Sequence, residues 1–230
     1  MNITDLKNSW RDEPDYHKQI HESFIENVNA DEELKKHRDF VEQNAFGFGE
    51  RSFWWLWKLL CKELPEDASM LEIGVFRGAT LSVWKLLKPK GRIFGVTPMD
   101  SSDGHWESDY KADIARMHDE FNLPQPRIFH GRSDNPKLMS AVTTFLYDCV
   151  YIDGDHSYEG ALHDLVTYAP LVRKGSYLII DDACCDMKMP WGFFQGIETV
   201  TNATLDYMKD NSANWDFVTN VVHLRVYRRK

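Results

Sequence analysis

The sequence predicts an α/β fold in which helices cover both faces of a mostly parallel, seven-stranded sheet. Short apolar segments alternate with helix-like segments from residue 69 to residue 208, and this alternation is typical of parallel sheets. The apolar segments within 215–229 have no helix between them, which indicates an antiparallel strand at the C-terminal edge. Residues 1–50 are charged and lack the alternation. We therefore expect an N-terminal helical cap or lid over 1–50 and one domain over 51–230.

The N-terminal region contains two kinds of helical signal. Residues 23–46 carry a sparse apolar stripe that includes Phe24, Val28 and Leu34, and this spacing predicts one or two modest helices. Residues 47–64 are rich in tryptophan and leucine at helical spacing, which predicts a buried helix.

The remaining elements follow one another with short connections. Strands are predicted, in chain order, at 69–75, 92–97, 127–131, 147–153 and 175–182, and twice within 215–229. Helices are predicted at 78–88, 109–121, 135–142, 158–172 and 196–208. Ligands of such sheets bind at the carboxyl ends of the strands, near the point where the strand order switches. The residues just after each strand are therefore the candidates for a functional site.

Charge and composition argue against several classes of protein. The formal net charge of −9 disfavours a nucleic-acid binder, which needs a basic face to neutralise phosphates, and also docking on anionic lipid. The four cysteines form no CxxC motif, so neither a disulfide framework nor a zinc site is predicted. No apolar signal core and no stretch of ~20 apolar residues occur. The expected setting is the cytoplasm, with no membrane partner.

The first predicted strand runs into the segment LEIGVFRGAT (71–80), which places Glu72 before Gly74 and Gly78. Glycines permit a tight turn and a close approach of the backbone to a ligand, and the following helix offers free N–H groups. The spacing differs from the G-x-G-x-x-G of dinucleotide-binding proteins. A carboxylate at Glu72 disfavours a pyrophosphate and suits a ligand with ammonium or hydroxyl groups. A plain strand–turn–helix junction explains the glycines equally well.

The second and third strands end in polar loops. An acid that binds ribose hydroxyls is expected after the second strand, but Thr97 occupies the most natural position and Asp100 follows it. After the third strand, Ser133 and Asp134 are candidate contacts for the edge of a base. Solvated loops, or an N-cap for the helix at 135–142, account for these residues as well.

Three carboxylates follow the fourth and fifth strands, namely Asp153, Asp181 and Asp182. If these strands are neighbours, the carboxylates meet at one edge, which is unfavourable unless a cation neutralises them. Oxygen ligands of this kind suit Mg²⁺, Ca²⁺ or Mn²⁺ rather than zinc. His156 stands at the mouth of this site and is the candidate proton acceptor. Helix caps and solvated loops are the simpler alternative for each residue taken alone.

Three segments together are similar to a known family. LEIGVFRGAT (71–80), VYIDGDHSYEGALHDLVTYAPLVRKGSYLIIDD (150–182) and GIETVTNATLDY (196–207) resemble class I S-adenosylmethionine-dependent methyltransferases. The most similar branch is the metal-dependent O-methyltransferases, which includes macrolide-sugar O-methyltransferases and cephalosporin-hydroxylase-like proteins. The resemblance covers roughly residues 45–230 and implies a Rossmann-like class I methyltransferase fold.

The resemblance implies roles for the acidic cluster. Asp153, Asp181 and Asp182 match the family positions that hold magnesium or another hard divalent cation, and Asp153 also borders the cofactor. His156 matches the general base of the sugar-methylating members.

The resemblance also implies a cofactor site for S-adenosylmethionine. Glu72 lies beside the methionine part of the cofactor, with Gly74 and Gly78 in the turn. Two positions depart from the family: the ribose-binding acid after the second strand is displaced, and Arg132 stands where an acid is expected after the third. The remaining candidates for the ribose and adenine contacts are Asp100, Ser133 and Asp134.

The implied reaction is transfer of the methyl group of S-adenosylmethionine to a hydroxyl of a sugar or glycan. The sulfonium is already activated, so the protein positions and deprotonates the acceptor. Trp191 and Phe193, in the segment after the fifth strand, are candidate contacts for the acceptor or part of a lid. A catechol-like or other natural-product hydroxyl is the alternative acceptor. The expected partner is thus a small molecule or glycan, with homo-oligomers left open and no nucleic acid.

Two other classes of protein compete with this interpretation. A nicotinamide-dependent oxidoreductase is disfavoured because G-x-G-x-x-G is missing and Glu72 precedes the turn. A non-catalytic binding protein is disfavoured because the set of Asp153, His156, Asp181 and Asp182 is complete.

Overall fold

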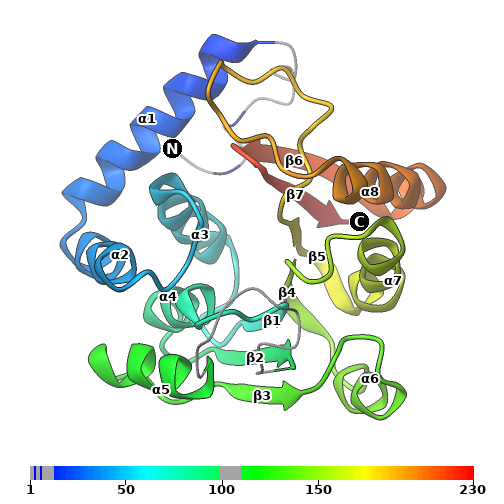
Figure 1. Ribbon diagram of the computed structural model, residues 1–230, viewed down its shortest axis with the longest axis horizontal. Helices are drawn as coiled ribbons and strands as arrows, with labels where there is room; N and C mark the ends of the chain where they lie inside the picture. Colours follow the sequence, from blue (N-terminus) through cyan, green and yellow to red (C-terminus); the bar gives the residue numbers. More distant parts are fainter. Residues whose placement is uncertain (1–2, 4–5, 7–12, 99–109) are drawn as a thin grey trace.

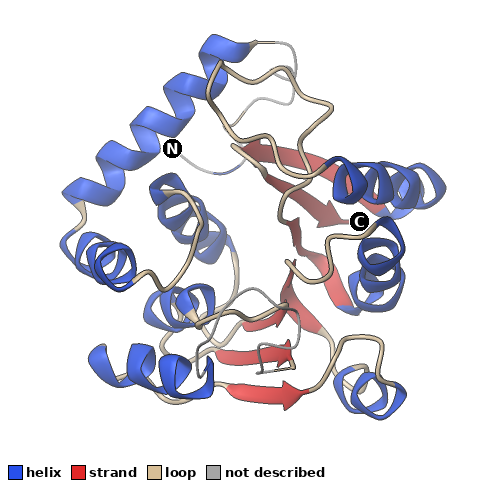
Figure 2. Ribbon diagram, viewed as in Figure 1, coloured by secondary structure: helices blue, strands red, loops and turns tan. Residues whose placement is uncertain are grey.

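One mixed sheet of seven strands runs through the described part of the computed structural model, which comprises residues 3, 6, 13–98 and 110–230 (Figures 1 and 2). The strand order is β3-β2-β1-β4-β5-β7-β6. The strands are β1 (Ser69–Ile73), β2 (Arg92–Thr97), β3 (Arg127–His130), β4 (Tyr147–Ile152), β5 (Val172–Ile180), β6 (Trp215–Val221) and β7 (Leu224–Arg229). The α/β fold predicted from the sequence is confirmed.

The strand order switches at β1, which pairs in parallel with β2 on one side and β4 on the other. β5 extends the parallel set, whereas β7 is antiparallel to both β5 and β6. The hairpin of β6 and β7 therefore returns into the sheet, so that β7 lies inside it and β6 forms the edge. The sequence predicts the C-terminal strand itself at the edge. Because Ile180 at the end of β5 pairs with Arg225 at the start of β7, the β6–β7 turn reaches the edge where the parallel strands end.

Helices cover both faces of the sheet (Figure 2). Residues of α3, α4 and α5 share one apolar core with Met70, whereas residues of α6, α7 and α8 share the other with Leu71. Met70 and Leu71 are consecutive, so their side chains point to opposite faces, and both are buried. The helices are α1 (Pro14–Ala30), α2 (Glu32–Asn44), α3 (Arg51–Glu63), α4 (Ala79–Leu87), α5 (Tyr110–Glu120), α6 (Pro136–Val142), α7 (Tyr158–Tyr168) and α8 (Glu198–Asn211).

The N-terminal helices α1 and α2 pack on the side of the sheet that α3 covers (Figure 1). Phe24 and Val28 of α1 and Leu34 of α2 are buried in the same apolar cluster as Trp57 of α3. This continuity means that the first helices extend the core of the domain. Their action as a lid stays a prediction.

Two helices form where the sequence predicts one or two, and their ends follow from local chemistry. The first begins at Pro14, earlier than expected, because the fixed φ of proline suits the first turn of a helix. Asp31 separates the two as the N-cap of α2, where its carboxylate accepts a hydrogen bond from the Leu34 N–H at 3.1 Å. Within the described ranges, no helix is long and apolar enough to cross a bilayer.

Candidate functional site

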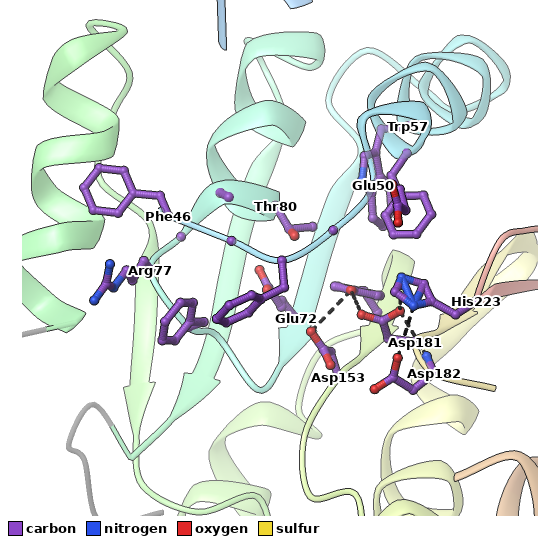
Figure 3. Close-up of a pocket in the computed structure, with 18 of the residues that line it drawn as sticks. Phe46, Glu50, Trp57, Glu72, Arg77, Thr80, Asp153, Asp181, Asp182 and His223 are labelled. Carbon is purple, nitrogen blue, oxygen red and sulfur yellow. Dashed lines mark hydrogen bonds and ion pairs between the residues drawn. The ribbon is translucent and has the colours of Figure 1, made fainter. Parts of the chain in front are cut away.

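Two cavities meet at the carboxyl ends of the parallel strands. The larger, of about 690 Å³, opens over the ends of β1 to β4, and Gly74, Thr97 and Ser133 line it. The smaller, of about 410 Å³, lies between the ends of β1 and β5 and the loop that precedes α3 (Figure 3). The side chains that line both cavities are Phe48, Phe76, Asp153 and His156. A molecule in one cavity would therefore meet a molecule in the other beside these residues.

Gly74 brings the end of β1 against the end of β4. Its φ is +94°, and a Cβ at this position would lie 1.8 Å from the carbonyl oxygen of Asp153. The Asp153 N–H donates to the carbonyl oxygen of Ile73 at 2.8 Å, which keeps the two chains paired beyond their strands. Only glycine permits this approach, so the first glycine of the G-x-x-x-G segment shapes the floor of the site.

Asp181, Asp182 and His223 form a compact group at the end of β5 (Figure 3). One ligand atom from each side chain lies within 4.8 Å of those of the other two. His223 Nδ1 is 3.3 Å from Asp182 Oδ1, and His223 Nε2 is 3.7 Å from Asp181 Oδ1. Neither ring nitrogen of the buried His223 has a hydrogen-bond partner among the described residues. Two carboxylates facing an unpartnered imidazole fit a divalent cation.

Asp153 is linked to this group through Tyr151. The Tyr151 phenol donates to Asp181 Oδ2 at 2.7 Å and to Asp153 Oδ2 at 3.3 Å. Burial and the charge of Asp181 raise the pKa of Asp153 above its usual range, and the same two causes raise the pKa of Asp182. Crowded carboxylates with raised pKa values favour a bound proton or cation. The three acids named from the sequence thus lie together.

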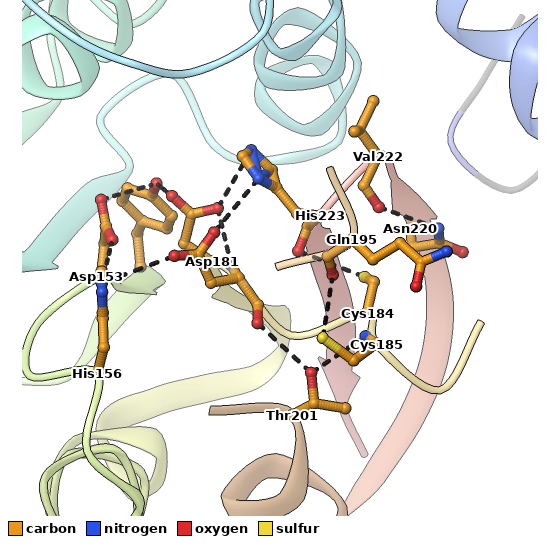
Figure 4. A network of polar contacts seen from close by, with 12 residues as sticks. Asp153, His156, Asp181, Cys184, Cys185, Gln195, Thr201, Asn220, Val222 and His223 are labelled. Carbon is orange, nitrogen blue, oxygen red and sulfur yellow. Dashed lines mark hydrogen bonds and ion pairs between the residues drawn. The ribbon is translucent and has the colours of Figure 1, made fainter. Parts of the chain in front are cut away.

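His156 lies beside Asp153 (Figure 4) and also close to Asp182. Its Nε2 is 3.6 Å from Asp153 Oδ1 and 3.7 Å from Asp182 Oδ2. The Thr199 hydroxyl donates to the carbonyl oxygen of His156 at 2.6 Å, which holds the loop in place. The interaction with Asp153 raises the pKa of His156 to about 9. The side chain is 46% exposed, so a ligand in either cavity can reach the imidazole.

Glu72 projects from β1 into the smaller cavity (Figure 3). It is buried, and its Oε2 has no hydrogen-bond partner in the part of the chain that the structure describes. Burial, then the charges of Asp153 and Asp181, raise the pKa of Glu72 well above its usual value. A cationic group bound here would stabilise the ionised carboxylate.

The structure describes two of the three residues that were predicted to contact the ribose or the base. Ser133 lines the larger cavity, whereas Asp134 is exposed and forms an ion pair with Arg132 at 3.4 Å. Asp100 lies outside the described residues. The N-cap of α6 is Asn135, whose side chain accepts hydrogen bonds from the first turn, so neither Ser133 nor Asp134 is required as a cap.

Three aromatic residues stand in the loop between β5 and α8. Trp191 is fully exposed. Phe193 packs edge-on against His21 of α1, with ring centroids 5.0 Å apart. Phe194 lines the smaller cavity, and its ring centroid is 5.1 Å from that of His223. Phe194 is therefore the member of the three that borders the cavity, while the substrate contacts expected of Trp191 and Phe193 stay predictions.

Tyr151 and His223 are site residues that the sequence analysis missed. Tyr151 had a usable signal, because it stands two residues before Asp153 and alternate residues of a strand share a face. His223 had none, since it lies in a segment that predicts two strands, and only the register of the β6–β7 hairpin places it at the turn.

Comparisons with known proteins agree with this geometry. Residues 71–183 match the family model of a methyltransferase domain. One curated relative, the uncharacterised protein R132 of Acanthamoeba polyphaga mimivirus, is 26% identical over 148 residues. That alignment covers 62% of this chain and 64% of the viral protein, so it spans less than two thirds of the relative.

Solved structures share the fold at low sequence identity. A putative caffeoyl-CoA O-methyltransferase from Staphylococcus aureus has a TM-score of 0.64 at 17% identity, covering 91% of this chain and 99% of that chain. The MycE methyltransferase of the mycinamycin biosynthetic pathway, solved with Mg, SAH and mycinamycin VI, has a TM-score of 0.58 at 18% identity, covering 86% and 54%. The O-methyltransferase TomG from Streptomyces achromogenes, solved with SAM, has a TM-score of 0.53 at 15% identity, covering 87% and 90%.

The family match assigns residues 71–183 to a methyltransferase domain, and the strand order and the site at its switch point agree with that match. The fold is that of the class I, S-adenosylmethionine-dependent methyltransferases. The resemblance inferred from the three sequence segments is thereby confirmed.

Proposed function

We propose that this protein is an O-methyltransferase that moves the methyl group of S-adenosylmethionine to a hydroxyl of a sugar or glycan. The observation that carries the proposal is the meeting of the two cavities at Asp153 and His156. A cofactor in one cavity and an acceptor in the other would bring the methyl carbon and the hydroxyl oxygen together beside a base. The methyltransferase-domain match favours this reaction over hydride transfer with a nicotinamide.

The larger cavity suits the adenosine part of the cofactor. Its volume of about 690 Å³ falls within the range of roughly 300–1,000 Å³ that small-molecule sites occupy. Gly74 and Ser133 line it at the switch point of the strand order. The methionine part would extend from the larger cavity into the smaller one, where the buried carboxyl group of Glu72 would accept a hydrogen bond from its ammonium group.

Asp153, Asp181 and Asp182 offer carboxylate oxygens, which fit Mg²⁺ or another hard divalent cation. When bound, such a cation stabilises the negative charge that develops on the acceptor oxygen. The chain keeps these carboxylates in position: the Tyr151 phenol donates to Asp181 and Asp153, and the Asp182 N–H donates to Asp181 Oδ1 at 3.0 Å.

His156 is the general base, which accepts the proton of the acceptor hydroxyl at Nε2. Its half-exposed ring is open to both cavities. The ionised Asp153 raises the pKa of His156, and neutralisation of the carboxylates by a cation removes the cause of that rise. An imidazole with a near-neutral pKa is suited to proton transfer at physiological pH.

Exposed aromatic rings at the smaller cavity support a ring-shaped acceptor. Phe48 is 71% exposed and Phe194 is 50% exposed, and both line this cavity. Such rings pack on the apolar face of a sugar or on another aromatic ring. The resemblance to macrolide-sugar O-methyltransferases favours a sugar. A catechol-like phenol is the alternative, which the structural similarity to a putative caffeoyl-CoA O-methyltransferase supports.

Ligand-induced stabilisation tests the cofactor. We would measure the Tm with S-adenosylhomocysteine and with NADH, each with and without Mg²⁺. S-adenosylhomocysteine is expected to raise the Tm because it binds only the folded protein. A rise with NADH alone would contradict the proposal. Incubation with S-adenosylmethionine and a library of sugars, sugar nucleotides and catechols, followed by mass spectrometry, identifies the acceptor class.

Two variants test the assigned roles. Asp153→Asn and His156→Ala are both expected to lose methyl transfer, while His156→Ala keeps its affinity for S-adenosylhomocysteine. His163→Ala, at a residue of α7 that is hydrogen-bonded to Thr167 and lines neither cavity, serves as the control. Full activity of Asp153→Asn in the presence of a chelator would exclude the metal, and full activity of His156→Ala would exclude the base.

A further inference from the structure

His223 is held at the acidic pair by the hairpin that carries it. The turn follows β6, and its Val222 adopts the left-handed φ of +50°. The carbonyl oxygen of His223 accepts hydrogen bonds from the Ala183 N–H at 3.1 Å and from the Cys184 thiol at 3.3 Å (Figure 4). The turn is thus fastened to the segment that leaves β5, so the imidazole and the acids Asp181 and Asp182 are fixed in one unit.

The His223 ring packs against apolar neighbours at the wall of the smaller cavity, with its nitrogens close to the carboxylates. It is 7% exposed, and its centroid lies 4.9 Å from that of Phe53 and 5.1 Å from that of Phe194. Neither ring nitrogen has a hydrogen-bond partner within the described ranges. A buried polar group without a hydrogen bond is costly, and a cation shared by the imidazole and the acids would remove that cost.

Asp182 has a left-handed backbone conformation, and its carboxylate lies 3.3 Å from His223 Nδ1. Its φ is +53°, which is uncommon for a residue with a side chain. Gly196 makes room for it, because a Cβ there would lie 2.3 Å from the Asp182 carbonyl oxygen. The Ile197 N–H donates to the same oxygen at 2.9 Å. Strain of this kind persists where the surroundings impose it, often at functional sites.

We propose that His223 is a direct metal ligand and that, with Asp181 and Asp182, it selects a first-row transition-metal dication such as Mn²⁺, Fe²⁺ or Co²⁺ over Mg²⁺. The inference deepens the proposed function and rests on its metal site. A cation about 2.1 Å from each donor requires donors roughly 3–4.2 Å apart. His223 Nδ1 and Asp182 Oδ1, 3.3 Å apart, already meet this requirement, and the set of three donors, which lies within 4.8 Å, needs only a slight contraction around the ion. Imidazole suits such cations, whereas Mg²⁺ prefers oxygen ligands and water.

The two histidines of the site then have separate tasks. His223 closes the inner side of the acidic pair, where its ring is buried. His156 stands on the outer side, 3.7 Å from Asp182 Oδ2 and about half exposed, so its nitrogen stays open to the acceptor.

Metal titration of the chelator-treated protein tests the inference without reference to catalysis. Binding of Co²⁺, Mn²⁺ and Mg²⁺ would be measured by calorimetry, with the visible absorption of Co²⁺ as a report of nitrogen ligation. Co²⁺ and Mn²⁺ are expected to bind at least about tenfold more tightly than Mg²⁺. His223→Ala is expected to lose at least the roughly 10–100-fold in Co²⁺ affinity that a supporting partner contributes, and to change the Co²⁺ spectrum.

Two further variants complete the experiment. His223→Asn keeps a polar group with an oxygen donor and is expected to shift the preference toward Mg²⁺, whereas His163→Ala, the control, keeps the wild-type affinities. Binding of S-adenosylhomocysteine shows that each variant is folded. Equal affinity for Mg²⁺ and Co²⁺ in the wild type, or an unchanged Co²⁺ spectrum in folded His223→Ala, would overturn the inference. If Co²⁺ binds through His223 but no acceptor is methylated, the proposed function fails and the metal site stands.

Discussion

The hydroxyl of Tyr151 lies 2.7 Å from Asp181 Oδ2, and this hydrogen bond joins the end of β4 to the end of β5. The same hydroxyl reaches Asp153 at 3.3 Å, while its ring packs edge-on against Trp57 with centroids 5.3 Å apart. One buried side chain thus connects the apolar core to the acidic cluster. A phenol donor between two carboxylates keeps both oriented toward the same space.

Tyr151→Phe is expected to preserve the packing and to weaken the site. Loss of a hydrogen-bond partner that orients metal ligands typically lowers metal affinity by about 10–100-fold, and methyl transfer should fall with it. Calorimetric metal titration and a methylation assay check this outcome. Tyr147→Phe is the matched control, because its buried hydroxyl donates to Val142 away from the site. Equal metal affinities of the two variants would show that the Tyr151 hydroxyl does not organise the cluster.

Gly74→Ala is expected to abolish cofactor binding and to lower the free energy of unfolding by more than about 2 kcal/mol. The new Cβ would lie 1.8 Å from the Asp153 carbonyl oxygen at a φ of +94°. Gly175→Ala separates the effect of the steric clash from that of the left-handed backbone, because Gly175 has a φ of +80° but nothing within 4 Å of the added Cβ. It should cost only the roughly 1–2 kcal/mol of the left-handed backbone. Urea unfolding of both variants measures the difference, and equal losses would remove the steric argument.

Asp164 should make stability depend on pH. It is fully buried on α7, and burial raises its pKa from 3.8 to about 6, although the Ser133 hydroxyl opposes the rise. Between these pH values the folded state holds a proton that the unfolded state has released. The free energy of unfolding therefore falls as pH rises from about 4 to 6 and then levels off, a change of up to about 3 kcal/mol for this group.

Asp164→Asn removes this titration and is expected to gain stability relative to the wild type as pH rises through that window. Urea unfolding of both proteins at several values between pH 4 and pH 7 gives the comparison. Asp210→Asn, a change at an exposed acid of α8, should leave the wild-type dependence intact. A constant difference between Asp164→Asn and the wild type across the window would contradict the assignment.

Phe194→Ala is expected to raise the KM for the acceptor at least several-fold, because the exposed ring borders the smaller cavity. The affinity for S-adenosylhomocysteine should not change. Phe193→Ala provides the contrast, since its ring packs against His21 and the core and its loss should lower the Tm instead. A Phe194→Ala protein with an unchanged acceptor KM would place the acceptor elsewhere.

The layered fold and the acidic cluster are the parts that could be predicted from the sequence. Strands buried on both faces read as continuous apolar runs, as with Met70 and Leu71 in β1. The rule that ligands bind at the carboxyl ends of parallel strands then singles out the positions after β4 and β5. Asp153 and Asp181 lie at those positions and meet through Tyr151.

The rest depends on contacts between distant segments, which no local pattern records. The alternation of apolar residues identifies β6 and β7 as strands, but it does not indicate that β7 pairs with β5. His223 reaches the site only through that pairing. The loop after β5 has no period at all, so nothing in the sequence indicates that Phe194 rather than Phe193 faces the cavity.

The interior position of β7 has a consequence for the folding of the protein. β7 follows both of its neighbours, β5 and β6, in the chain, and until it docks, β5 presents an open edge. Asp181 and Asp182 lie at that edge, and His223 joins them only when the hairpin docks. Closure of the sheet and assembly of the group of Asp181, Asp182 and His223 therefore depend on the same step, the docking of the β6–β7 hairpin.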